Sequence, residues 1–110
     1  MAGWYELNKS GDGQFRFSLK NDDGDTLLLS EGYKVKASAE SGIASVRANC
    51  GDDARYERKT AAGGKFFFNL KAANHQVVGT SPMFASEAAR DAAIASAKAC
   101  GASTAVKDNA

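Results

Sequence analysis

Apolar and polar residues alternate in two short stretches of this chain, and the two stretches resemble each other. The stretch FRFSLK (residues 15–20) places a large apolar side chain at every second position. The stretch FFFNLK (residues 66–71) keeps this alternation, except that Phe67 stands where the first stretch has Arg16. A period of two is typical of a strand with one buried face. We therefore predict two equivalent strands that bury Phe17 and Phe68, with Phe67 on the opposite face.

These strands belong to an internal repeat with an offset of 51 residues. Without any gap, 13 of the 45 positions from 4 to 48 are identical to the residue 51 places further along. Each copy continues through a third apolar run, TLLLS (residues 26–30) or VVGTS (residues 77–81), into a helical pattern after Tyr33 or Phe84. One such unit cannot cover its own apolar face, so the two copies are expected to pack on each other.

Each predicted helix carries a stripe of small and apolar residues. In the first copy the stripe contains Ala39, Gly42, Ile43, Val46 and Cys50, and in the second Ala93, Ile94 and Ala97. Ser86 is a suitable N-cap for the second helix, and Gly101 can end it. A β-like run follows each helix, ARYERKT (residues 54–60) and STAVKD (residues 103–108), and the first of these also opens the second copy.

The order of these elements predicts an α+β fold made of two β(3)-α-β repeats. They form one mostly antiparallel sheet with both helices on one face. The 110 residues suit a single compact domain (1–110) with repeats at 4–53 and 55–108 and the run 54–60 shared between them. We expect a monomer with pseudo-two-fold symmetry.

Three motifs together resemble the YegP-like family of small tandem-repeat proteins of uncharacterised function. They are the paired F-x-F-x-L-K stretches, the run SEGYKVKASAESGIASV (residues 30–46) and the closing AVKD (residues 105–108). The resemblance covers nearly the whole chain, and it implies that the two units exchange their last strands. It implies no activity and no functional residues. In residues 81–97 the second copy departs from the family pattern, with Pro82 for an acidic residue and alanines for polar ones, so the resemblance does not establish that the two halves are functionally equivalent.

The overall charge and the cysteine content restrict the possible partners and the cellular compartment. A formal net charge of +1, from 14 basic and 13 acidic side chains, gives no electrostatic argument for nucleic-acid backbones or anionic membranes. No stretch approaches the roughly 18 apolar residues of a membrane span, and the N-terminus does not look like a secretory signal. The two cysteines, Cys50 and Cys100, fit a reduced compartment, so we expect a cytoplasmic protein.

Candidate catalytic and metal-binding groups are sparse. The single histidine, His75, falls in a predicted turn, and each cysteine precedes a glycine at the end of a predicted helix, without an activating neighbour. The stretch NDDGD (residues 21–25) begins like a calcium loop but lacks the glutamate expected at position 12. Two cysteines and one histidine cannot provide a structural zinc site. We therefore predict no catalytic residues, no metal and no cofactor.

The strand alternation does suggest a binding surface on the side of the sheet without helices. It places Trp4, Arg16, Arg55 and Phe67 there, one aromatic and one cation in each copy. The favoured function is a small non-catalytic binding or structural module with a protein or small-molecule partner. Single-stranded nucleic acid stacked on the same face is the alternative. An enzyme of unrecognised type is a second alternative, although no acid–base or nucleophile cluster can be named for it.

Overall fold

The computed structural model describes residues 3–110, and these residues form one sheet with two helices. In chain order the elements are β1 (Trp4–Lys9), β2 (Phe15–Lys20), β3 (Thr26–Leu29), α1 (Lys36–Asn49), the short 3-10 helix η1 (Asp53–Arg55), β4 (Tyr56–Thr60), β5 (Phe66–Lys71), β6 (Val77–Thr80), α2 (Glu87–Cys100) and β7 (Val106–Asp108). The described strands form a seven-stranded sheet in the order β4-β5-β6-β3-β2-β1-β7.

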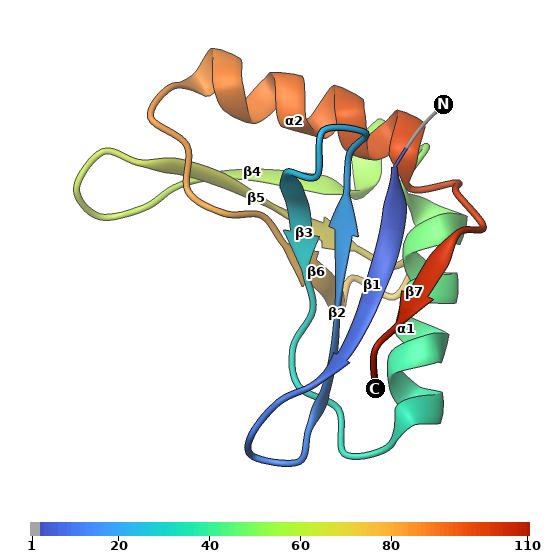
Figure 1. Cartoon of the computed structure of the whole chain (residues 1–110). Coiled ribbons are helices and arrows are strands. Elements are labelled where there is room, and N and C mark those ends of the chain that lie inside the picture. The colour runs from blue at the N-terminus through green and yellow to red at the C-terminus, as the bar shows by residue number, and fades with distance from the viewer. Residues whose placement is uncertain (1–2) are drawn as a thin grey trace.

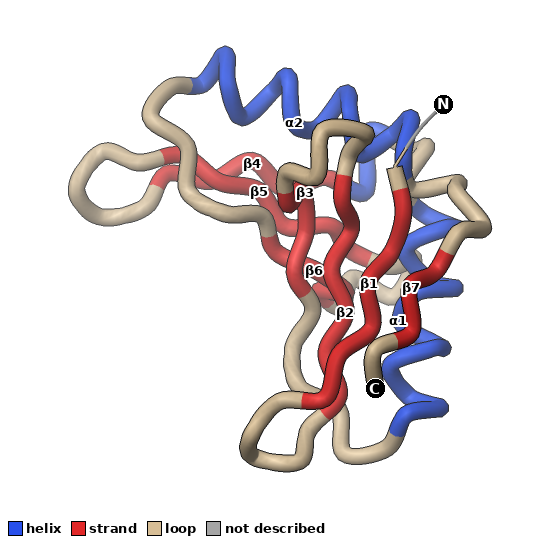
Figure 2. The backbone as a smooth tube through the Cα atoms, in the orientation of Figure 1, coloured by secondary structure: helices blue, strands red, loops and turns tan. Residues whose placement is uncertain are grey.

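The two copies meet in the middle of this sheet. Within each copy the first three strands pair antiparallel, and β3 joins β6 through the pair Leu29 and Thr80. These two residues are 51 positions apart, so the pseudo-two-fold axis of the repeat passes beside their pair. The sheet is strongly twisted: in Figure 1, β1 and β2 run down the view while β4 and β5 run across it. Figure 2 shows the same arrangement by secondary structure.

The end of the chain crosses from the second copy to the first. After α2 the strand β7 lies parallel to β1, with Tyr5 opposite Val106 and Leu7 opposite Asp108. After α1 the chain enters β4, which pairs antiparallel with β5. Each helix is therefore followed by a strand that lies beside the other copy, and the predicted exchange of strands is confirmed.

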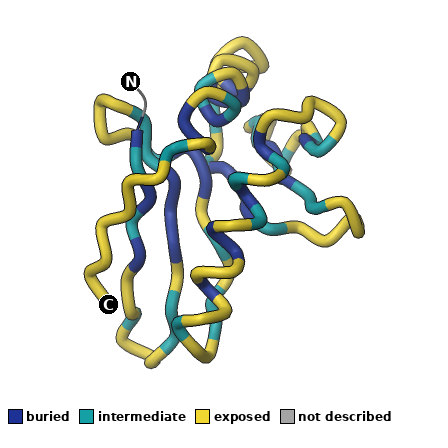
Figure 3. Tube along the Cα trace, turned by 90° about the vertical axis from the view of Figure 1, so that its right-hand side faces the viewer, coloured by how far each residue is buried: buried dark blue, intermediate teal, exposed yellow. Residues whose placement is uncertain are grey.

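Both helices cover the same face of the sheet, where the core lies. Helix α1 lies against β2, β5 and β6, and α2 lies against β2, β3 and β5. The fully buried side chains include Phe17, Phe68, Leu19 and Leu70, as the alternation predicts. At Gly42 a Cβ atom would lie 2.7 Å from the ring of Phe17, so the glycine lets α1 approach the sheet closely. In Figure 3 the buried dark blue stretches lie along the central strands and on parts of the helices, whereas the strand next to the C-terminus and the loops are largely yellow.

One tyrosine in each copy forms a hydrogen bond to the end of the helix from the other copy. The hydroxyl of Tyr5 donates to the carbonyl of Gly101 at 2.6 Å, and the hydroxyl of Tyr56 donates to the carbonyl of Cys50 at 2.6 Å. The pairs are equivalent in the repeat, and each joins the first strand of one copy to the end of the helix from the other copy. Both helix ends have carbonyls without a partner inside the helix, and the tyrosines satisfy one at each end.

Some predicted boundaries are wrong for local reasons. The run 54–60 is not all strand, because Asp53–Arg55 form η1, in which the Asp52 side chain accepts a hydrogen bond from the Ala54 N–H. Arg55 therefore lies outside β4.

The register of the β2–β3 pair shifts after Leu19, so Leu27 and Leu28 are both buried although they are adjacent in sequence. The β5–β6 pair has the equivalent shift after Leu70. The N-cap role of Ser86 is confirmed, since its side chain accepts from the Ala89 N–H.

Candidate binding surface

The side of the sheet opposite the helices, here called the helix-free face, carries a row of side chains across six strands. Cross-strand partners share a face, so the row can be followed from pair to pair. It contains Glu6, Ser18, Leu29, Thr80, Asn69 and Glu57. Most of these groups are polar, and Leu29 lies at the centre with 49% of its surface exposed.

In the second copy the polar groups of this face bond to one another. The Thr80 hydroxyl donates to the Asn69 Oδ1 at 2.8 Å, and the Asn69 amide donates to the Glu57 Oε1 at 3.1 Å. The ammonium of Lys71 donates to the other carboxylate oxygen of Glu57 at 3.0 Å. Hydrogen bonds from Asn69 and then Lys71 hold the pKa of Glu57 below its usual range. This part of the face is a satisfied polar network.

In the first copy the same face holds the one tryptophan of the chain. The indole N–H of Trp4 donates to Glu6 Oε2 at 2.9 Å, and the ammonium of Lys107 lies 4.6 Å from the centre of the ring. Beside it Lys20 donates to the hydroxyl of Thr26 at 2.7 Å. Trp4 is therefore half-buried, with its polar atom bonded and a cation over its ring.

The structure does not gather the four predicted binding residues into one cluster. Trp4 lies opposite Lys20 and Arg16 opposite Asn8, so the two are four residues, or about 13 Å, apart along the β1–β2 pair. Arg16 contacts Gln14 at 3.1 Å within its own hairpin. Phe67 is half-buried on the other half of the sheet. Arg55 lies in η1, where its guanidinium is 3.6 Å from Asp52.

A hollow of about 430 Å³ opens where β3 and β6 meet. It is lined by Leu29, Ser30, Glu31, Val77, Val78, Gly79, Thr80 and Ser81. Leu29 and Val77 are large apolar side chains that stay 49% and 39% exposed, and Glu31 is the ionisable residue of this lining. Sequence reasoning misses this hollow, because the apolar run TLLLS predicts a third strand but does not indicate which of its leucines faces the solvent. The shift in register after Leu19 turns Leu27 and Leu28 into the core and leaves Leu29 outside.

The residues that could act in catalysis or bind a metal are either buried or isolated from one another. Cys50 and Cys100 are buried free thiols, and burial raises the pKa of both, which lowers the thiolate fraction needed for a nucleophile. His75 is exposed in a turn with a φ of 67°, at the position where the first copy has Gly24. Among residues 3–110 no group of three or more His, Cys, Asp or Glu side chains could hold a metal ion. Within the same range no helix is long and apolar enough to cross a membrane.

Comparison with known proteins agrees with this architecture. A family model described as a domain of unknown function, DUF1508, matches residues 10–57 and again residues 61–108. The UPF0339 protein YegP of Shigella flexneri is 62% identical over 109 residues, which cover 99% of both chains. The solution NMR structure of yegP from E. coli, a protein of unknown function, is 60% identical, with a TM-score of 0.94 and coverage of 99% of this chain and 94% of that one.

A second solved structure gives the same result. The solution NMR structure of a UPF0339 protein from Shewanella oneidensis is 50% identical, with a TM-score of 0.93, and the match covers 98% of this chain and 92% of that one. These findings confirm the resemblance to the YegP-like proteins. The names of these relatives assign no function to any of them.

Proposed function

We propose a binding function for this chain, which belongs to the family defined by the domain of unknown function DUF1508. The protein is a small non-catalytic module of the cytoplasm that binds a protein partner on its helix-free face, at the hollow between β3 and β6. One observation carries this proposal: Leu29 and Val77 remain exposed beside Glu31 in a depression of about 430 Å³. Depressions of this size hold small ligands or single side chains of a partner.

The lining indicates the chemistry of the partner. An apolar side chain that enters the hollow removes Leu29 and Val77 from water, which is favourable in proportion to the area covered. The carboxylate of Glu31 favours a cation next to that apolar group. In the second copy Pro82 stands at the position equivalent to Glu31, so the hollow is not symmetric and a partner binds in one orientation. A long or aromatic apolar side chain followed by a basic group fits these requirements.

The geometry gives less support to the alternatives. Stacking of nucleic-acid bases needs an accessible aromatic surface, whereas the ring of Trp4 is covered by Lys107. Glu6 and Glu57 also lie among the lysines of this face and weaken any positive stripe. Catalysis needs a base within reach of a nucleophile, and the two thiols are buried away from the exposed His75. The free cysteines support a reducing compartment.

Backbone amide spectra of the labelled protein can test this function with simple probes. Benzylamine and phenylacetate are similar in size and differ in charge, and each is added to about 20 mM, because single-group contacts bind in the millimolar range. We expect benzylamine to shift the amides of residues 29–31 and 77–81, and phenylacetate to shift them less. Glu31→Gln should remove the difference, whereas the control Asp23→Asn makes the same charge change in a distant exposed turn and should preserve it.

Three outcomes would overturn the proposal. Shifts that are absent from the hollow at this concentration would show that it does not accept an apolar cation. An added single-stranded oligonucleotide of dT or U that shifts the amides of β1 and β2 would instead support nucleic-acid binding. Shifts confined to the helices would mean that the helix-free face is not the binding surface.

A further inference from the structure

The repeat contains two equivalent strand edges, and residues 3–110 cover only one of them. Strand β1 and strand β4 are the first strands of the two copies, and β7 lies along the outer edge of β1. Strand β4 pairs with β5 and ends the described sheet on the other side. Its residues after Tyr56 are half-buried or exposed. The fold therefore has a second position for a parallel strand, beside β4.

The covered edge shows which backbone groups a strand uses at this position. The Tyr5 N–H donates to the Ala105 carbonyl at 2.9 Å, and the Leu7 carbonyl accepts from the Asn109 N–H at 2.8 Å. In the second copy the N–H of Tyr56 donates to the carbonyl of Asp53 in η1. The equivalent of Leu7 is Arg58, which has the same register in the antiparallel pair and so turns its N–H and carbonyl outward. A strand beside β4 can bond there.

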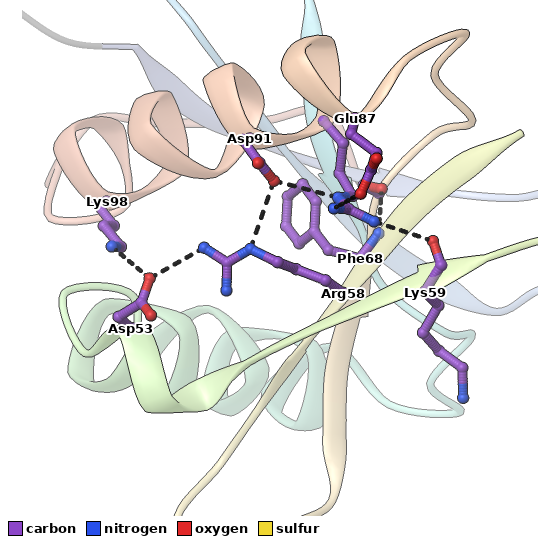
Figure 4. Close-up of polar contacts among 9 residues, drawn as sticks. Asp53, Arg58, Lys59, Phe68, Glu87, Asp91 and Lys98 are labelled. Atoms are coloured by element: carbon purple, nitrogen blue, oxygen red, sulfur yellow. Dashed lines mark hydrogen bonds and ion pairs between the residues drawn. The ribbon is translucent and has the colours of Figure 1, made fainter.

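Charged side chains line the uncovered edge. Leu7, in the strand beside β7, is 1% exposed and belongs to the core, whereas Arg58 bridges Asp53 at 3.1 Å and Asp91 of α2 at 3.4 Å. Lys98 completes the cluster through a contact of 2.7 Å to Asp53, as Figure 4 shows. Charges on an edge strand prevent indiscriminate pairing with other strands. A strand that binds here must match these charges.

One reversal of charge specifies what a matching strand carries. On the covered edge Asp108 of β7 forms an ion pair with Lys36 at the start of α1. The residue equivalent to Lys36 is Glu87, at the start of α2. A strand placed beside β4 as β7 lies beside β1 would therefore bring its residue opposite Arg58 close to Glu87. A second copy of this chain would bring Asp108 to that place, where Glu87 repels it.

We propose that the outer edge of β4 binds an extended segment of a partner protein, parallel to β4, with a basic residue in the position that Asp108 holds in β7. The main chain of the segment pairs with Arg58, and its basic side chain pairs with Glu87. Recognition by strand addition gives affinity through the backbone and selectivity through alternate side chains. This site lies away from the hollow between β3 and β6 and does not depend on it.

Two matched peptides can test this proposal on the full-length labelled protein. The first has the sequence of residues 103–110, STAVKDNA, with blocked ends, and the second carries the change Asp108→Lys. We expect the second peptide to shift the amides of residues 56–60 and 87–91 and to bind about threefold to tenfold more tightly, the range for one exposed ion pair gained and one repulsion removed. The protein variant Glu87→Lys should reverse the preference, and Asp23→Lys, a distant control with the same charge change, should keep it.

The titrations, together with sedimentation of the protein alone, can also refute the edge site. If the two peptides bind with equal affinity to the unchanged protein and also to the Glu87→Lys variant, then Glu87 does not select the partner strand. Shifts at β1 rather than β4 would mean that the peptide displaces β7. Sedimentation that shows a dimer of the protein alone, together with loss of peptide binding on dimerisation, would assign the edge to a second copy.

Discussion

The two buried tyrosines at the helix ends allow a test of how the copies are held together. Tyr5 is fully buried, and its hydroxyl reaches Gly101, which is 96 positions away in sequence. Tyr56 makes the equivalent bond to Cys50. Tyr5→Phe or Tyr56→Phe keeps the ring and leaves a buried carbonyl without its donor. We expect each change to lower the free energy of unfolding at pH 7 by about 1–3 kcal/mol.

The same tyrosines predict how that loss changes with pH. Burial, more than any nearby charge, raises the pKa of both far above the ordinary value of 10. In the unfolded chain a tyrosine releases its proton above pH 10, whereas the folded protein keeps it. The contribution of each tyrosine to stability is therefore complete below pH 10 and is lost as the pH rises above that value. At pH 11 each hydroxyl that stays protonated costs about 1.4 kcal/mol of stability, the value of one pH unit.

Phenylalanine has no such proton, so the variants should lose less than the original protein at high pH. The difference in unfolding free energy between Tyr5→Phe and the unchanged chain should shrink by about 1.4 kcal/mol between pH 8 and pH 11. Urea melts at both pH values, followed by circular dichroism, measure this difference. Ile94→Val, a change in the core without a titrating group, serves as the control and should give the same difference at both pH values. If the Tyr5→Phe difference also stays constant, the hydroxyl is not buried in the way described.

Two further predictions concern the core and the exchange of strands. Phe17→Ala and Phe68→Ala should each lower the unfolding free energy by about 3–5 kcal/mol, because both rings are buried, whereas the half-buried Phe67 should cost much less; equal urea midpoints for Phe67→Ala and Phe68→Ala would contradict the assignment of faces. A fragment of residues 1–60 lacks the strand that covers β1 and the helix end that binds Tyr5, so we expect it to dimerise or stay unfolded. Sedimentation that finds it as a folded monomer would show that the copies are independent.

Much of the fold could be predicted from the sequence because the repeat gives each assignment twice. The alternation at residues 15–20 is ambiguous by itself, but it recurs at residues 66–71 with the same polarity. The helical stripe through Ala39, Ile43 and Val46 likewise recurs through Ala93 and Ile94, and all five are buried. Where the copies agree, the local pattern and the global packing point to the same structure.

The candidate site could be predicted less well, because its geometry depends on contacts between distant strands. The register shift that exposes Leu29 follows from how β2 and β3 pair, and no feature of TLLLS reveals it. Arg55 alternates correctly with its neighbours, yet hydrogen bonds within η1 remove it from the strand. The change from Leu7 in the first copy to Arg58 in the second is a signal that the sequence does contain. An arginine at a position that faces the core indicates that no strand lies beside β4 as β7 lies beside β1.

A comparison of the copies separates residues that the fold requires from residues that it leaves free. The hydroxyls of Ser30 and Ser81 each accept from the N–H of a core phenylalanine at 2.9 Å, so both copies keep a serine there to satisfy the same backbone group. No such constraint acts on Glu31 and its counterpart Pro82, or on Lys36 and its counterpart Glu87, which are not buried in either copy. Because the backbones are equivalent while these side chains differ, the two halves present different surfaces on one scaffold. Binding that depends on the difference should be lost when Glu31 or Glu87 is changed, with the fold intact.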